Sequence, residues 1–194
     1  MLRPLRIFLA ALACLLVTAG TARAAGGSYA FDGGTPSQRA QVRAALDASA
    51  FDWSLVPGTV TIHIARAIES EALPGEIWLD GELLDSGRFA WGVVQHEYAH
   101  QVDFLLLTPD ARAQLAAALG GTDWCYSLPG VPHGKHGCER FASTLAWAYW
   151  QVRDNCMRPE SRTDEAAAMA PAAFRKLLAR LIGAPDRVPQ LRRS

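Results

Sequence analysis

The spacing of apolar and polar positions changes several times along the chain, and each change marks a predicted element. Val42, Ala45 and Leu46 recur at helical intervals after Thr35-Pro36-Ser37-Gln38, a sequence typical of a helix start. A helix is therefore predicted over 35–49.

Two segments of the first half predict short strands. Residues 60–64 alternate apolar with polar positions and are rich in β-branched side chains, which is typical of a half-buried strand. Pro74-Gly75 then marks a turn, and residues 76–80 follow as a second strand that ends at Gly81. The Gly-rich segment 26–34 predicts only an irregular start.

The second half of the chain is predicted to be mostly helical. Its apolar positions recur at helical spacing in four segments, 88–107, 108–119, 139–153 and 164–182. A loop rich in Gly and Pro is predicted between the second and third of these, over 122–137. The pattern contains no internal repeat and no sign of a second domain.

The first residues are organised like an export signal. Arg3 and Arg6 precede an uninterrupted apolar run over 7–17, and Ala22-Arg23-Ala24 supplies the small residues that signal peptidase requires. The apolar run is too short to cross a bilayer. We therefore expect a signal peptide over 1–24, cleaved after Ala24, and a secreted protein.

The mature chain would then comprise residues 25–194. Its length of about 170 residues suits one domain, of which residues 159–194 would form a C-terminal helix and tail. No second apolar span follows, so stable membrane insertion is not expected. A lipoprotein anchored at Cys14 is the weaker alternative, because Cys14 lies inside the apolar run and is followed by Leu-Leu-Val.

Removal of the signal peptide would also change the charge balance. Lys+Arg falls from 19 to 16 because Arg3, Arg6 and Arg23 leave, whereas Asp+Glu stays at 19. A net charge of about −3 argues against nucleic acid as the main partner. The lysines are few beside many arginines and alanines, a composition that indicates a GC-rich bacterial source.

Three cysteines would remain after cleavage, in a compartment that permits disulfides. A helix over 139–153 would be about 22 Å long, so Cys138 and Cys156 at its two ends could not reach each other. Two pairings stay open, Cys125–Cys138, which closes the shorter loop, and Cys125–Cys156. One thiol is left over in either case.

The most specific chemistry lies in the predicted helix over 88–107. His96-Glu97-Tyr98-Ala99-His100 has the H-E-x-x-H pattern, which places His96 and His100 one turn apart on the same helix face. Both imidazoles can therefore reach one metal ion. Glu97 lies about 100° away on the helix, where it can hold and deprotonate a water molecule beside that ion.

A catalytic zinc site uses three protein ligands and keeps one position open. The predicted helix over 139–153 offers Glu139 as the third ligand, with small residues nearby that permit close helix packing. An acidic residue that merely favours the helix N-terminus is the competing interpretation. Two other ligand sets stay open, in which Asp103 replaces Glu139, or His133 or His136 binds the metal.

The segments HEYAHQVDF and ERFA together resemble the gluzincin metallopeptidases, most closely the branch that includes the anthrax lethal-factor peptidase domain. The resemblance covers about 78–150. It implies one zinc ion per chain, bound by His96, His100 and Glu139, with Glu97 as general base. It further implies a zincin-like α+β fold: a small sheet, an active-site helix with H-E-x-x-H, and a second helix with the third ligand.

In zincins a strand at the sheet edge, just before the active-site helix, aligns the substrate. The segment 76–80 lies at the corresponding place and is expected to bind a peptide by strand addition. Asp103 is seven residues past His96, so its side chain would stay on the metal face. It is the candidate for a carboxylate that orients a ligand imidazole.

The oxyanion formed in peptide hydrolysis needs a hydrogen-bond donor besides the metal, and zincins supply a His or a Tyr. The candidates are His133, His136 and Tyr126 in the predicted loop, and Tyr149 in the predicted helix after it.

The sequence thus predicts a secreted zinc endopeptidase that cleaves a peptide or protein substrate through a zinc-activated water. Two alternatives stay open. One is a zincin-shaped protein that binds zinc without catalysis, which an intact Glu97 disfavours. The other is a zinc hydrolase of non-peptide amides such as those of cell-wall cross-links.

Overall fold

A computed structural model describes residues 27–186, which form an α+β structure of six α-helices and one mixed sheet. The sheet order is β1-β2-β4-β3, with bounds Tyr29–Gly33 for β1, Val60–Ala65 for β2, Glu76–Asp80 for β4 and Glu71–Leu73 for β3. β1, β2 and β4 run parallel, and β3 is antiparallel to β4. The predicted coarse class is therefore confirmed.

One face of the sheet is buried and the other is largely open. In β2 the alternation predicted from sequence holds, with Val60, Ile62 and Ile64 buried in the core and Thr61 and His63 on the opposite face. His63 stacks on Trp78 of the neighbouring strand there. The open face explains why only every second position of the strand is strongly apolar.

The helix α1, Pro36–Ala48, begins where its sequence predicted. Thr35 accepts a hydrogen bond from the Gln38 backbone, while the Gln38 side chain accepts one from the Thr35 backbone, a capping box that fixes the first turn. The Gln38 side chain also donates to the Gly81 carbonyl at 3.0 Å. Because Gly81 begins the short helix α2, Gly81–Asp85, this contact ties α1 to the end of β4.

Two helices form the centre of the molecule. α3, Trp91–Leu106, packs against α5, Gly137–Tyr149, on one side and against α1 on the other. The side chains of α3 are buried almost without interruption from residue 94 to residue 103. This burial on all sides accounts for the strongly apolar composition of the segment.

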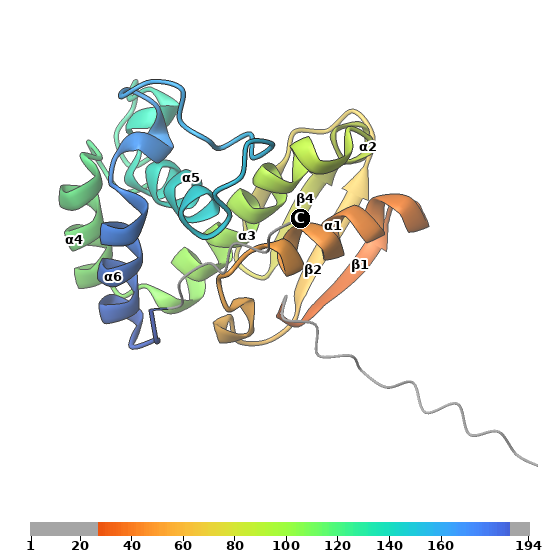
Figure 1. Ribbon diagram of the computed structural model, residues 1–194, viewed down its shortest axis with the longest axis horizontal. Coiled ribbons are helices and arrows are strands. Elements are labelled where there is room, and N and C mark those ends of the chain that lie inside the picture. Colours follow the sequence, from red (N-terminus) through yellow and green to blue (C-terminus); the bar gives the residue numbers. More distant parts are fainter. Residues whose placement is uncertain (1–26, 187–194) are drawn as a thin grey trace, which may run out of the picture.

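The remaining helices, α4 over Pro109–Leu119 and α6 over Pro171–Ile182, lie on the α5 side of α3, away from the sheet (Figure 1). Short 3₁₀ turns occur at Trp53–Leu55, Gly87–Ala90, His133–Lys135 and Glu165–Ala167, the last two named η3 and η4. Thr108 caps α4 ahead of Pro109, as its sequence indicated.

The hairpin of β3 and β4 is fastened to α3 by one side chain. Gln101 accepts a hydrogen bond from the Gly75 amide at 2.8 Å, and its amide group donates to the Leu73 and Glu76 carbonyls at 2.8 and 3.0 Å. The turn of the hairpin is therefore held directly beside the helix that carries the H-E-x-x-H pattern.

Three element predictions need correction. The predicted irregular start contains β1, whose five residues gain their hydrogen bonds only from β2 and so carry little local signal. The strand Glu76–Asp80 lies inside the sheet rather than at its edge, because β3 folds back over it. The last helix begins at Pro171 instead of residue 164, after a 3₁₀ turn that packs on α5.

Within residues 27–186, no helix has the length and apolar character needed to cross a membrane. The predicted signal peptide over 1–24 lies outside the described residues.

Candidate metal centre

Three side chains from two helices converge in the interior. His96 and His100 lie one turn apart on α3, with 3.2 Å between their Nε2 atoms. Glu139, in the first turn of α5, places its Oε2 atom 3.2 Å from His96 Nε2 and 3.4 Å from His100 Nε2. Each of the three residues is only 5–7% exposed.

These separations fit a bound metal ion. Donor atoms bound tetrahedrally to zinc at about 2.0–2.2 Å are about 3.3–3.5 Å apart, close to the three distances between these donor atoms. Two imidazole nitrogens and one carboxylate oxygen are also the donor set of many catalytic zinc sites. Buried His96, His100 and Glu139 could therefore hold a metal ion, as predicted.

No other described His, Cys, Asp or Glu side chain has a donor atom within 4.8 Å of all three. Cys125 and Cys138 also lie near Glu139, but they are bonded to each other as a disulfide and offer no thiolate.

The electrostatics of the cluster favour a positive charge at its centre. Burial acts to raise the pKa of Glu139, but hydrogen bonds from His100 and His96 outweigh it and hold the pKa well below its usual range. Burial acts to lower the pKa of His96, whereas the Glu139 and Glu97 carboxylates raise it, with a net rise. A cation bound between these groups would likewise compensate the negative charge of the carboxylates.

Glu97 lies beside the cluster and is 6% exposed. Within residues 27–186 its carboxylate has no hydrogen-bond partner, although His96 and His100 interact with it electrostatically. Burial raises the pKa of this carboxyl. A carboxyl with a raised pKa beside the candidate ligands is suited to accept a proton.

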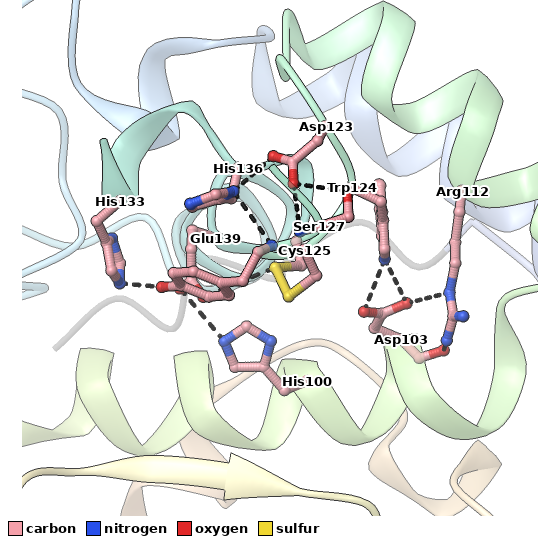
Figure 2. The surroundings of a disulfide bond; sticks show 12 residues. His100, Asp103, Arg112, Asp123, Trp124, Cys125, Ser127, His133, His136 and Glu139 are labelled. Carbon is pink, nitrogen blue, oxygen red and sulfur yellow. Dashed lines mark hydrogen bonds and ion pairs between the residues drawn. A yellow bond between two sulfur atoms is a disulfide. The ribbon is translucent and has the colours of Figure 1, made fainter. Parts of the chain in front are cut away.

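His133 lies in η3 and is directed toward the cluster from the side of the solvent. Its Nε2 atom is 3.3 Å from Glu139 Oε2, and Figure 2 shows His100 and His133 meeting the same carboxylate from two directions. With a side chain 60% exposed, His133 stands at the entrance of the site.

Tyr126 lies near His133, with 6.1 Å between the two ring centroids. Its backbone adopts a positive φ of 51°, which is uncommon outside glycine and turns the chain sharply after the disulfide. Burial and the nearby Glu139 carboxylate raise the pKa of its hydroxyl, which therefore stays protonated and able to donate a hydrogen bond.

Within residues 27–186, no hydrogen bond or ion pair joins the His136 side chain to His96, His100 or Glu139. His136 is buried, and its Nδ1 atom contacts the Asp123 carboxylate and the Tyr126 amide (Figure 2). Its burial is explained by the bridge between Asp123 and His136, which joins the two ends of the loop. His136 therefore fastens the loop that presents His133 and Tyr126.

The contacts of Asp103 differ from the prediction. Its carboxylate accepts hydrogen bonds from Arg112 Nε at 2.7 Å and from Trp124 Nε1 at 3.0 and 3.1 Å (Figure 2). The described residues show no hydrogen bond from Asp103 to His96 or His100. Asp103 instead connects α3 with α4 and with the start of the loop that precedes α5.

Tyr149 is likewise removed from the site. Its ring packs against Phe51 in the core, with centroids 5.2 Å apart, so it is not available to an oxyanion. The cysteine prediction, in contrast, is resolved in favour of the shorter loop: Cys125 and Cys138 are bonded, and Cys156 is free.

Two further residues belong to this neighbourhood and were not predicted. Ser143 lies one turn after Glu139 on α5, and its Oγ atom is 3.1 Å from His96 Nδ1. Glu165 of η4 contacts both Ser143 and His133, at 2.7 and 3.1 Å. Helical spacing from Glu139 could have identified Ser143, whereas Glu165 approaches through tertiary structure alone.

Comparisons of the chain with protein-family profiles, with curated proteins and with solved structures find no match.

Proposed function

We propose that this chain is a zinc-dependent endopeptidase of the zincin type, as the resemblance to gluzincins implies. The observation that carries the proposal is the convergence of His96, His100 and Glu139 from two helices into one buried set of donors. A patterned pair of histidines occurs by chance in many chains, but a third donor at ligand distance does not follow from the pattern.

Zinc held by these residues supplies a Lewis acid that polarises a carbonyl and lowers the pKa of a water molecule. Glu97 is the general base: it accepts a proton as the water oxygen attacks the peptide carbonyl carbon. It returns the proton to the amine nitrogen as the carbon–nitrogen bond breaks. His133 and Tyr126, at the entrance, are the candidates to donate a hydrogen bond to the oxyanion.

A pocket of about 450 Å³, lined by Ser143, Glu165, Met157 and Arg158 among others, lies on the Nδ1 side of His96. None of the three candidate ligands lines it. On the other side of α3, β3 forms the edge of the sheet. An extended peptide that adds to β3 would pass close to α3.

We further propose that the protein is exported through the signal peptide predicted over 1–24. A disulfide between Cys125 and Cys138 is typical of an oxidising compartment, which supports this destination.

The proposal is tested by measuring zinc content and hydrolysis of a mixed peptide library with purified wild-type protein and three variants. Glu139→Ala is expected to lose the metal. Glu97→Gln is expected to keep it while hydrolysis falls by roughly 10²- to 10⁴-fold, the usual effect of removing a general base. His63→Ala, which alters a histidine on the open sheet face, is the control and should match wild type.

Each other outcome has a distinct meaning. A wild-type protein that takes up no zinc after reconstitution would overturn the proposal. In another outcome, wild type binds zinc and Glu139→Ala does not, but wild type cleaves no peptide. That result would indicate a zinc-binding protein or a hydrolase of other amides.

A further inference from the structure

Glu165 contacts two side chains of the candidate site, Ser143 and His133, and each contact is called an arm below. Its side chain is 25% exposed and belongs to η4, which packs on α5. Its Oε2 atom accepts a hydrogen bond from Ser143 Oγ at 2.7 Å, and its Oε1 atom lies 3.1 Å from His133 Nδ1. One carboxylate thus reaches both a neighbour of a candidate ligand and the histidine at the entrance.

The arm through Ser143 determines which nitrogen of His96 carries a proton. A hydroxyl has one proton, and a carboxylate accepts but does not donate. Ser143 therefore donates to Glu165, and toward His96 Nδ1, 3.1 Å away, it can only accept. His96 must then carry a proton on Nδ1, so Nε2, which faces His100 and Glu139, is the nitrogen left to bind a metal ion.

A weaker contact at Ser143 does not alter this conclusion. The Met157 sulfur lies 3.7 Å from Ser143 Oγ and could also accept the hydroxyl proton. The proton would be used there as well, so Ser143 would still accept from His96.

The second arm acts on His133 in the same manner. Glu165 Oε1 accepts from His133 Nδ1, so the Nε2 atom of His133 is the one presented toward Glu139, at 3.3 Å. His133 is largely exposed, and an exposed imidazole keeps one orientation only if something holds it. Within the described residues, Glu165 is its only polar partner besides Glu139.

We propose that Glu165 is a positioning residue of the candidate metal centre, which holds a proton on Nδ1 of His96 through Ser143 and orients the His133 ring directly. The proposal rests on the metal site of the proposed function. It goes beyond that function because it assigns a role to a residue outside both sequence motifs. Mutation of a carboxylate that orients a ligand histidine commonly weakens metal affinity by about 10- to 100-fold.

The first experiment measures the zinc Kd by competition with a chromophoric chelator. Glu165→Ala and Ser143→Ala are each expected to weaken zinc binding by about 10- to 100-fold. The variant with both substitutions should bind zinc no more weakly than the single variant with the higher Kd. Both substitutions interrupt the same chain of hydrogen bonds from Glu165 through Ser143 to His96. Thr144→Val is the control, since Thr144 contacts the Glu165 backbone carbonyl at 3.4 Å but not its carboxylate.

The second experiment identifies the histidine tautomers by ¹⁵N NMR of zinc-free, histidine-labelled protein. Wild type should show His96 and His133 protonated on Nδ1. In Glu165→Gln at least one of them is expected to change, because an amide accepts at one end only, whereas the carboxylate accepts at both. This readout reports proton position and would not respond to a merely structural role.

The proposal is overturned if Glu165→Ala binds zinc within twofold of wild type, or if the losses of the two single variants add in full. It is equally overturned if Nδ1 of His96 carries no proton in zinc-free wild type. A wild-type protein that binds no zinc contradicts the proposed function instead, and the NMR experiment still decides the role of Glu165.

Discussion

Asp123 illustrates how single residues hold the entrance of the site in place. Its carboxylate accepts hydrogen bonds from His136, from the Ser127 amide and hydroxyl, and from the Leu128 amide. None of these groups touches the three candidate ligands, yet the loop they order carries Tyr126 and His133. At the scale of the residue, the site therefore depends on polar contacts that the sequence motifs do not include.

The same contacts predict an acid-sensitive contribution to stability. Burial acts to raise the pKa of Asp123, but its hydrogen bonds, that of His136 first, outweigh this and lower the pKa to about 2. The ordinary value is 3.8, so the contribution is fully present above pH 3.8 and is lost as the pH falls toward 2. Urea unfolding midpoints between pH 5 and pH 2 measure it.

Asp123→Asn is expected to unfold at lower urea than wild type at pH 5, and its midpoint should decline less between pH 4 and pH 2. Asp47→Asn, at an exposed position of α1, serves as the control. Parallel acid profiles of wild type and Asp123→Asn would contradict the role assigned to Asp123.

At the scale of the element, much of the fold was predictable because the signals are local. The start of α1, the alternation of β2 and the helical pattern of α3 each depend on neighbouring residues, and each is found where it was predicted. β1 was missed because its partner β2 is distant in sequence. β3 pairs with the neighbouring strand β4, but its three residues are too few to show an alternating pattern.

The candidate site divides in the same way. H-E-x-x-H is read within one helix turn, and Glu139 could be inferred from the need for a third donor. The partners of Asp103 and the approach of Glu165 could not be predicted, because they depend on how α4, the preceding loop and η4 pack around α3 and α5. Tertiary contacts of this kind leave no periodic pattern.

The segment between α4 and α5 makes a further prediction at this scale. The disulfide joins Cys125 to Cys138 across 13 positions, and closing a loop of that length stabilises a fold by about 3 kcal/mol through the unfolded state. The variant with both cysteines changed to serine should lose about that much free energy of unfolding in denaturant titration.

Cys156→Ser is the matched control, since Cys156 is a free thiol. It should unfold close to wild type. If a reducing agent shifts the midpoint of wild type no more than that of the double variant, the disulfide does not stabilise the protein.

At the scale of the whole molecule, the three candidate ligands lie between two halves. α3 contacts the sheet and α1 on one side, while α5 belongs with α4, α6 and η4 on the other (Figure 1). A metal ion bound by His96, His100 and Glu139 would therefore join the two central helices, and its binding energy would add to folding stability.

Removal of the metal should accordingly lower the melting temperature. Free zinc at 100 times its Kd stabilises the folded state by about 2.7 kcal/mol, which a chelator would abolish. Thermal unfolding followed by circular dichroism, with zinc and with excess chelator, measures the difference. Glu139→Ala should melt at the same temperature in both conditions; an equal response to chelator in that variant would place the metal elsewhere.

The three hydrogen bonds of Gln101 have a consequence for where a bound chain would be cut. Gln101 directly follows His100. The turn of α3 that carries one candidate ligand is therefore also hydrogen-bonded to the hairpin of β3 and β4, in which β3 is the edge strand. If the proposed peptidase docks its substrate on β3, the offset between the docked peptide and the candidate ligands depends on this one glutamine side chain. A shorter side chain there would then shift the register, and with it the bond that the proposed peptidase cleaves.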